Sequence, residues 1–227
     1  MDCLMKRILF AAIICSFTGF SAAPVRAQFS STGPFAGTMS EGWETFPLFG
    51  GTYLASPESI MGGKATIANS KMSIYQPGSA FLGTSGTAQV ADGTRGLMLN
   101  YFAQTATITW NTPITEFGAW FAASTLPPGY NADPAIITVS FYGQSATLLD
   151  AETFTYSHSA TGDGGLDWHG WVAAAPVYSI SLKGDFLVMD GLRAVAVPEP
   201  SATTLLTFAV CLVAGCWRTR KGCVRHT

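Results

Sequence analysis

Residues 137–142 read Ile-Thr-Val-Ser-Phe-Tyr, and this stretch decides the fold class. Ile137, Val139 and Phe141 would share one face of a strand, and the Thr, Ser and Tyr between them would share the other. The same period of two recurs over 106–110, 153–157 and 178–182. Such alternation predicts strands that bury one face and leave the other in water.

Turn-forming residues separate these segments. Gly, Pro and Asn gather at 77–78, 92–93, 111–113, 127–129, 162–165 and 183–185. Further strands are expected at 97–102 and 117–122, and 186–189 reads as a strand buried on both faces. Many short strands between turn signals predict an all-β domain, an antiparallel β-sandwich or jelly roll.

Composition narrows the function classes. Of 227 residues, 11% are charged and 48% hydrophobic, with 24 Gly and 12 Pro, which argues against a helical bundle and against a disordered chain. The net charge of −2 argues against a nucleic-acid partner. Residues 28–197 hold five basic and 12 acidic side chains, a net charge of −7, and no cysteine. The central domain is therefore acidic and has no disulfide.

The N-terminus has the pattern of a secretory signal peptide over residues 1–27. Lys6 and Arg7 precede an apolar run at 8–20, and Val25 and Ala27 are the small residues that a signal peptidase requires. We expect export and cleavage after Ala27.

The C-terminus has three parts in order. The first, at 197–201, consists of Val197, Pro198, Glu199, Pro200 and Ser201. The second, at 202–217, is uncharged and predicts a single transmembrane helix. The third, at 218–221, holds the basic residues Arg218, Arg220 and Lys221, which favour a cytoplasmic tail at 222–227.

Together these three parts resemble the PEP-CTERM sorting signal of certain Gram-negative bacteria. The resemblance implies recognition by an exosortase in the membrane, which acts near the Pro-Glu-Pro. It further implies a protein held at, or released from, the surface of cells that make extracellular polysaccharide and biofilm. The main expectation is therefore a structural or adhesive role at the cell surface or in the extracellular matrix.

A second resemblance lies within the central domain, residues 28–196, and covers residues 117–192. The segments 117–121, 136–142, 168–172, 177–182 and 186–192 are similar in order to the jelly-roll domains that often precede this sorting signal. That resemblance implies a fold like a carbohydrate-binding module. In similar jelly rolls an acid near the position of Asp190 helps to hold a structural Ca²⁺ with residues near the start of the domain, where Glu41 and Glu44 lie here.

Tryptophans are the candidate ligand contacts, because a flat ring stacks on the apolar face of a pyranose. The candidates are Trp43, Trp120, Trp168 and Trp171. The odd spacing of Trp168 and Trp171 places them on opposite faces of a strand, so one of the two should be core. Trp110 alternates with Ile108 and should also be core. These residues support a first alternative function, a carbohydrate-binding module for extracellular polysaccharide.

Other chemistry has less support. Asp163, Asp167, His158 and His169 form the densest polar cluster and could hold a cation, but their spacing matches no known metal motif. No nucleophile elbow, zinc-protease helix or phosphate loop occurs, so we do not expect an enzyme. Because the fold and not the sequence spacing sets the two carboxylates of a glycosidase, a secreted polysaccharide hydrolase stays open as a second alternative.

Overall fold

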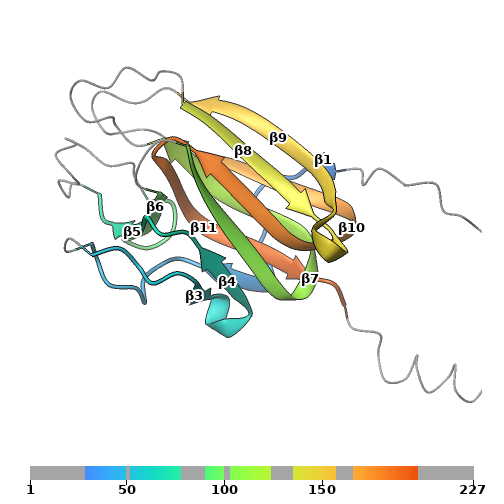
Figure 1. Ribbon diagram of the computed structural model, residues 1–227, viewed down its shortest axis with the longest axis horizontal. Helices are drawn as coiled ribbons and strands as arrows, with labels where there is room; N and C mark the ends of the chain where they lie inside the picture. The colour runs from blue at the N-terminus through green and yellow to red at the C-terminus, as the bar shows by residue number, and fades with distance from the viewer. Residues whose placement is uncertain are drawn as a thin grey trace, which may run out of the picture. The chain divides into compact units, whose positions relative to one another are not determined.

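The computed structural model describes residues 29–49, 52–77, 90–99, 103–123, 135–156 and 166–198 (Figure 1). The predicted signal peptide and the predicted C-terminal segments from Glu199 onward lie outside these residues. Within the described ranges, no helix is long and apolar enough to cross a membrane.

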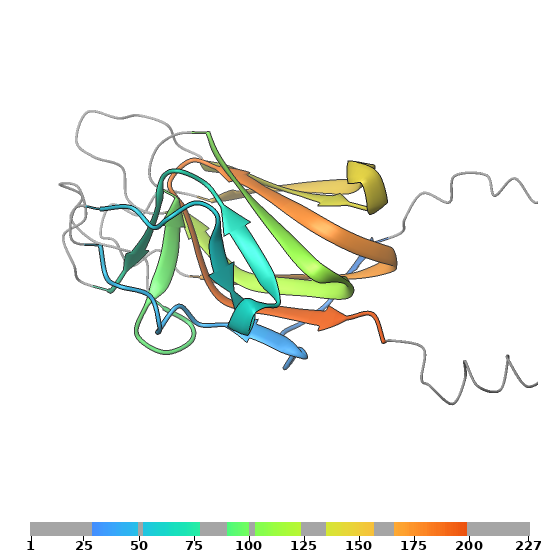
Figure 2. The ribbon, with the colours of Figure 1, turned by 60° about the horizontal axis from the view of Figure 1, so that its bottom comes forward.

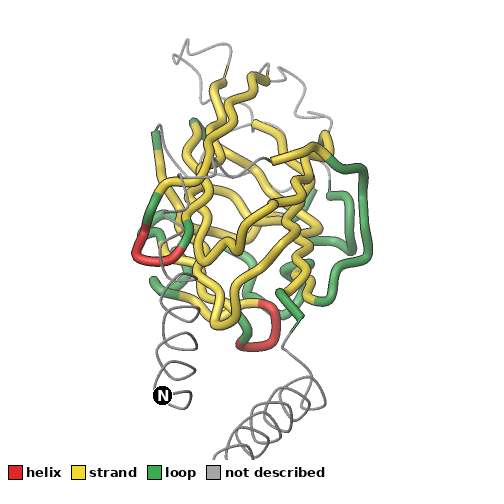
Figure 3. The backbone as a smooth tube through the Cα atoms, turned by 90° about the vertical axis from the view of Figure 1, so that its right-hand side faces the viewer, coloured by secondary structure: helices red, strands yellow, loops and turns green. Residues whose placement is uncertain are grey.

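Eleven strands and two short 3₁₀ turns make up the described structure (Figure 3). The strands are β1 (Phe29–Ser31), β2 (Met39–Glu41), β3 (Glu58–Ile60), β4 (Ala65–Ala68), β5 (Met72–Tyr75), β6 (Gly96–Leu99), β7 (Gln104–Ala123), β8 (Ala135–Tyr142), β9 (Leu148–Tyr156), β10 (Asp167–Gly184) and β11 (Leu187–Ala196). The 3₁₀ turns are η1 (Met61–Gly63) and η2 (Gln144–Ala146).

All strand pairs are antiparallel, as the alternating sequence predicted. The sheet order is β5-β6-β11-β7-β10-β8-β9. Off this path, β1 pairs with β10, β2 with β11, and β4 with both β3 and β7.

The two long strands β7 and β10 each belong to two layers. Residues 107–110 of β7 pair with β4 and residues 104–109 with the end of β10, whereas residues 114–123 pair with β11. Register shifts in the β7–β10 pair fall between Val172 and Ser179. Strands that bend at such irregularities carry a sheet around a corner, so the two halves can fold onto each other.

The result is a sandwich of two layers, visible on edge in Figure 2, where β8 and β9 (yellow) lie above β11 (orange-red). The β8 layer comprises β3, β4, residues 104–110 of β7, residues 179–184 of β10, β8 and β9. The β11 layer comprises β1, residues 167–173 of β10, residues 114–123 of β7, β11, β2, β6 and β5.

Aromatic rings fill the space between the layers. Phe117 of the β11 layer meets Phe141 of the β8 layer with ring centroids 6.4 Å apart, and Phe121 meets Phe154 at 5.6 Å. Trp171 stacks on Phe117 at 5.8 Å with a 14° angle between planes. Burial of such large apolar rings is the main stabilising contribution to the sandwich.

Most strand predictions are confirmed. Ile137, Val139 and Phe141 are all buried, and Trp110 is 4% exposed. Residues 187–190 are buried on both faces, as expected for a strand covered on each side.

The turn predicted at 111–113 is wrong. The chain continues through it as β7, and the carbonyl of Pro113 accepts a hydrogen bond from the N–H of Val197 at 2.8 Å. A proline lacks an N–H and is tolerated where a strand bends or its ladder is interrupted. The breaker therefore marks the corner of the sandwich and not the end of a strand.

Candidate functional site

The outer face of the β11 layer carries three aromatic side chains, which we call the aromatic patch: Phe35, Trp120 and Trp168. Trp120 on β7 and Trp168 on β10 are direct cross-strand partners. Their rings meet edge to face, with centroids 5.7 Å apart and planes at 68°. Phe35 meets Trp168 at 87°, with centroids 5.6 Å apart. All three side chains are half-buried, so each keeps part of its apolar surface in water.

Two glycines allow the Trp168 ring to lie on the sheet. Gly118 and Gly170 are cross-strand partners next to the tryptophan pair. A Cβ added at Gly118 would lie 2.3 Å from Cζ2 of Trp168, and one added at Gly170 would lie 2.6 Å from its Nε1. The indole N–H also donates to the carbonyl of Thr32 at 2.9 Å. The ring is thus held in place without a ligand, which lowers the entropy lost on binding.

Gly191 joins the aromatic patch to a polar cluster. It has a positive φ of 56°, and a Cβ added there would lie 3.0 Å from Cδ1 of Trp120 and 3.6 Å from the Cβ of Asp92. It directly follows Asp190, the cross-strand partner of Trp120 on β11. The backbone at Gly191 therefore lies between the Trp120 indole and residues 90–95.

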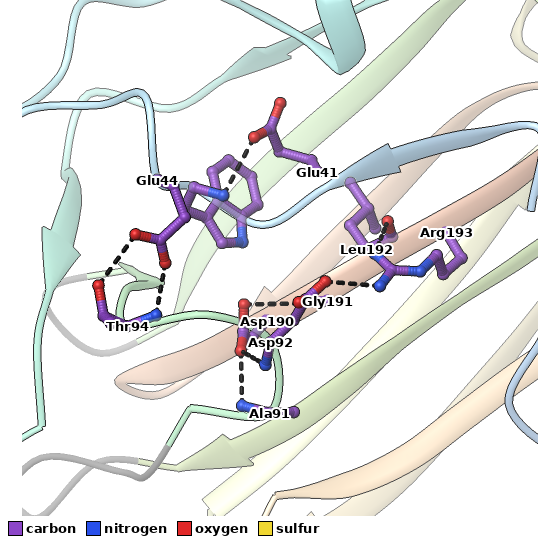
Figure 4. Close-up of polar contacts among 10 residues, drawn as sticks. Glu41, Glu44, Ala91, Asp92, Thr94, Asp190, Gly191, Leu192 and Arg193 are labelled. Atoms are coloured by element: carbon purple, nitrogen blue, oxygen red, sulfur yellow. Dashed lines mark hydrogen bonds and ion pairs between the residues drawn. The ribbon is translucent and has the colours of Figure 1, made fainter. Parts of the chain in front are cut away.

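Asp190 is fully buried and fastens residues 90–95 to β11 (Figure 4). Its Oδ2 accepts the N–H groups of Ala91 at 2.6 Å and Asp92 at 2.8 Å, and its Oδ1 accepts that of Gly191 at 2.7 Å. Burial raises the pKa of Asp190 to about 6, although these three N–H groups act in the opposite direction.

Asp92 and Glu44 make further polar contacts that hold residues 90–95 in place. Asp92 pairs with Arg193 of β11, with Oδ2 and the guanidinium nitrogen 2.5 Å apart. Glu44 accepts the N–H and hydroxyl of Thr94 at 2.5 and 2.9 Å and the N–H of Arg95 at 2.9 Å. The pKa of Glu44 is lowered, chiefly by the N–H of Thr94.

Each acid proposed for a calcium site thus has a role within the protein. The carboxylate of Glu41 accepts the N–H groups of Trp43 at 3.0 Å and Met61 at 2.8 Å, while Asp190 and Glu44 anchor residues 90–95. In the part of the chain that the structure describes, no group of three or more His, Cys, Asp or Glu could hold a metal ion. A structural Ca²⁺ stays a prediction.

Trp171 does not join the aromatic patch. It is 2% exposed, packs between the layers against Phe117, and donates its indole N–H to Glu152. The odd-spacing prediction is confirmed, since Trp168 and Trp171 point to opposite faces. Trp171 is therefore a core residue, and so is Trp43, which is 0% exposed; both findings correct the assignment of these residues as ligand contacts.

His169 also points inward. Its ring stacks on Phe154 with centroids 4.0 Å apart and planes at 10°, and burial lowers its pKa. Asp167 is exposed at the start of β10, and His158 and Asp163 lie outside the described residues. The stacking of the His169 ring on Phe154 accounts for its inward position, and no bound cation is needed to explain it.

Sequence reasoning missed Phe35 and the two glycines. A signal for the glycines was present, because Gly118 and Trp120, like Trp168 and Gly170, stand two residues apart and so share a strand face. A glycine two positions from a tryptophan on each of two neighbouring strands leaves room for a ring to lie flat. Phe35 had no such signal, because it lies in an irregular segment after β1.

No family model and no curated protein matches the chain. Among solved structures, it is similar to CsCBM6-3 from Clostridium stercorarium in complex with cellobiose, at 14% identity over 66% of this chain and 100% of that one, with a TM-score of 0.34. It is also similar to a DUF4465 family protein from Bacteroides caccae, at 10% identity over 75% and 100%, with a TM-score of 0.43. A third similar structure is the CBM22-1 xylan-binding domain of Paenibacillus barcinonensis Xyn10C. Its sequence identity is 12% over 73% of this chain and 100% of that one, with a TM-score of 0.36. At these identities and scores, the similarities say nothing of what this chain binds.

Proposed function

We propose that the chain is an exported protein whose β-sandwich domain binds a neutral polysaccharide through the aromatic patch. The observation that carries this proposal is the direct pairing of Trp120 with Trp168 on the outer face of the β11 layer. Two half-exposed indoles on one sheet face form a surface that a pyranose ring can cover.

The geometry of the patch favours recognition of a sugar face. The two indole planes meet at 68°, so the patch forms a corner and not a flat strip. A sugar ring that stacks on Trp120 would therefore have Trp168 at its edge. Stacking of this kind removes apolar surface from water on both partners.

Charge favours a neutral ligand. The central domain carries a net charge of −7, which repels polymers rich in carboxylate or sulfate groups at low salt. Arg193 is the cross-strand partner of Gly118, on which Trp168 rests, but Asp92 already pairs with it.

Binding is favoured over hydrolysis. A glycosidase needs two free carboxyl groups that flank the bond to be cleaved. Asp190 is buried under three N–H donors, and Asp92 is paired with Arg193. Asp190 and Asp92 are therefore not placed to act as a catalytic pair, and we propose no enzymatic activity.

The location in this proposal is supported by the sequence of the chain ends. A signal peptidase would remove residues 1–27, and an exosortase would act near Pro198–Glu199–Pro200 after the 202–217 span has stopped in the membrane. A sugar-binding domain delivered in this way would be placed to hold extracellular polysaccharide at the cell surface. That is the adhesive role expected from the sorting signal.

Binding of the purified full chain to an array of neutral and anionic oligosaccharides tests the function. We expect saturable binding to a neutral glycan that Trp120→Ala weakens by at least about tenfold. Leu48→Ala, which shortens a side chain that is 42% exposed in the segment between β2 and β3, is the matched control and should bind normally. Equal binding by Trp120→Ala and the wild type would refute the proposal.

A further inference from the structure

The outer face of the β8 layer is covered with hydroxyl groups. The cross-strand register aligns outward side chains in rows that run across the strands. One row crosses β3, β4, β7, β10, β8 and β9 in that order, and shorter rows run parallel to it. Most positions in these rows are serine or threonine. We call the following residues the hydroxyl face: Ser59, Thr66, Thr105, Thr107, Thr109, Thr138, Ser140, Tyr142, Thr153, Thr155, Ser179 and Ser181.

This face is accessible and almost uncharged. Every member of the hydroxyl face is exposed or half-buried. The rows of paired outward side chains contain one charged residue, Lys183, which lies between Thr105 and Thr138. Residues 28–197 carry a net charge of −7, but none of the acidic side chains that the structure describes takes a position in these rows.

The hydroxyl groups form a repeating array. Neighbouring strands lie about 4.8 Å apart, and side chains on one face recur about every 6.8 Å along a strand. Each hydroxyl can donate one hydrogen bond and accept two, so it is not restricted to one partner type. The hydroxyls of Thr138 and Thr153 lie 3.1 Å apart across β8 and β9, close enough to bond each other when no ligand is present.

The chemistry of the face selects its partner. An apolar surface would bury these hydroxyls without hydrogen bonds, which is unfavourable. A highly charged polymer would find almost no counter-charge here. A neutral polyol matches the face in both respects, because it carries many donors and acceptors and no charge.

We propose that the hydroxyl face docks a neutral polysaccharide in its aggregated, insoluble form. Such a ligand presents rows of hydroxyl groups over an area as broad as the sheet. This inference goes beyond the aromatic patch and does not depend on it. With one binding surface on each layer, a single domain would bridge two polysaccharide segments, which raises the overall strength of attachment.

The test is a depletion assay of the full chain, in detergent, on microcrystalline cellulose and on insoluble chitin. Thr107→Val/Thr109→Val removes two central hydroxyls and keeps the β-branched shape that strands favour. We expect this variant to lose at least about tenfold in affinity for the solid. Thr45→Val/Thr52→Val, which makes the same changes at exposed threonines off this face, should bind as the wild type does.

Failure of the two binding surfaces can be told apart. If Trp120→Ala abolishes depletion and Thr107→Val/Thr109→Val does not reduce it, the hydroxyl-face proposal is wrong and the patch stands. If the hydroxyl variant alone loses binding to the solids, the hydroxyl face stands, and the oligosaccharide array decides the patch proposal separately. Absence of wild-type binding to both solids also overturns the hydroxyl-face proposal.

Two controls guard the interpretation. If Thr107→Val/Thr109→Val does not fold, Ser140→Ala/Ser181→Ala removes two neighbouring hydroxyls with less change of volume. Sedimentation of the wild type and variant detects a competing role. A wild-type dimer that this variant converts to a monomer would show that the face joins two copies of the chain, which contradicts the proposal.

Discussion

The indole of Trp168 rests directly on the backbone of Gly118, its neighbour across β7 and β10. The ring occupies the space where any other residue at 118 would place its Cβ. A residue with no side chain thereby sets the orientation of one of the two indoles in the aromatic patch.

Gly118→Ala should displace the Trp168 ring. The added Cβ would lie 2.3 Å from the indole, so we expect a loss of about 1–3 kcal/mol in the free energy of unfolding, together with weaker glycan binding. Chemical denaturation measures the first effect. Gly33→Ala is the control, since a Cβ there meets nothing within 4 Å, and should leave stability nearly unchanged. Equal stabilities for the two variants would contradict the close contact.

Asp190 should make stability depend on pH. Its folded-state pKa of about 6 lies above the ordinary aspartate value of 3.8, so the folded protein binds the proton more tightly than the unfolded chain does. Stability from this group is therefore present at pH below 4 and is lost as the pH rises through 6, by roughly 3 kcal/mol in total. Unfolding of the wild type across pH 4–7 should show this slope, and Asp190→Asn should lack it.

His169 acts in the opposite direction over an overlapping range. Burial lowers its pKa, so protonation below about 6.5 favours the unfolded chain and stability falls as the pH falls. The informative quantity is therefore the difference between the wild type and Asp190→Asn, in which the His169 contribution cancels. A difference that does not vary with pH would show that Asp190 has an ordinary pKa.

Removal of divalent cations should leave the melting temperature of the protein unchanged. Asp190 and Glu44 satisfy their carboxylate oxygens with N–H and O–H donors of residues 91–95 and Gly191. Calorimetry with and without a chelator measures the effect, because a cation that binds only the folded protein raises its melting temperature. A fall of several degrees with chelator would support the structural Ca²⁺ implied by the jelly-roll resemblance.

The sorting signal predicts a new C-terminus. Mass spectrometry of protein recovered from the cell surface should find the chain ending near residues 198–201, with its N-terminus after Ala27. Glu199→Ala should prevent the C-terminal cut and leave the N-terminal cut unchanged. Surface material that still carries Cys223 would contradict processing.

The strands were largely predictable from the sequence, but the layers were not. The period of two at 137–142 correctly identified β8 and its buried face. The same reasoning divided β7 at residues 111–113, because a bend within a strand and a turn between strands use similar residues. Which strands curve from one layer into the other is decided by tertiary pairing, which local patterns do not record.

The site was predictable in part. Odd spacing separated Trp168 from Trp171, but it could not say which of them is buried. The two tryptophans have different hydrogen-bond partners. The indole N–H of Trp171 donates to Glu152 on β9, and the indole N–H of Trp168 donates to the backbone carbonyl of Thr32. Both partners are distant in sequence, so neither tryptophan's environment can be inferred from its neighbours along the chain.

Because β7 and β10 are each continuous through both layers, the sandwich has no seam along which it can come apart. If the half of β7 or β10 in one layer unfolds, the bend that joins it to the other half is also lost. The pairing in the second layer is then disrupted as well. We therefore expect all-or-none unfolding, with calorimetric and van't Hoff enthalpies that agree. At a cell surface, the location proposed above, a domain built in this way would unfold under force as one unit and would not fray gradually.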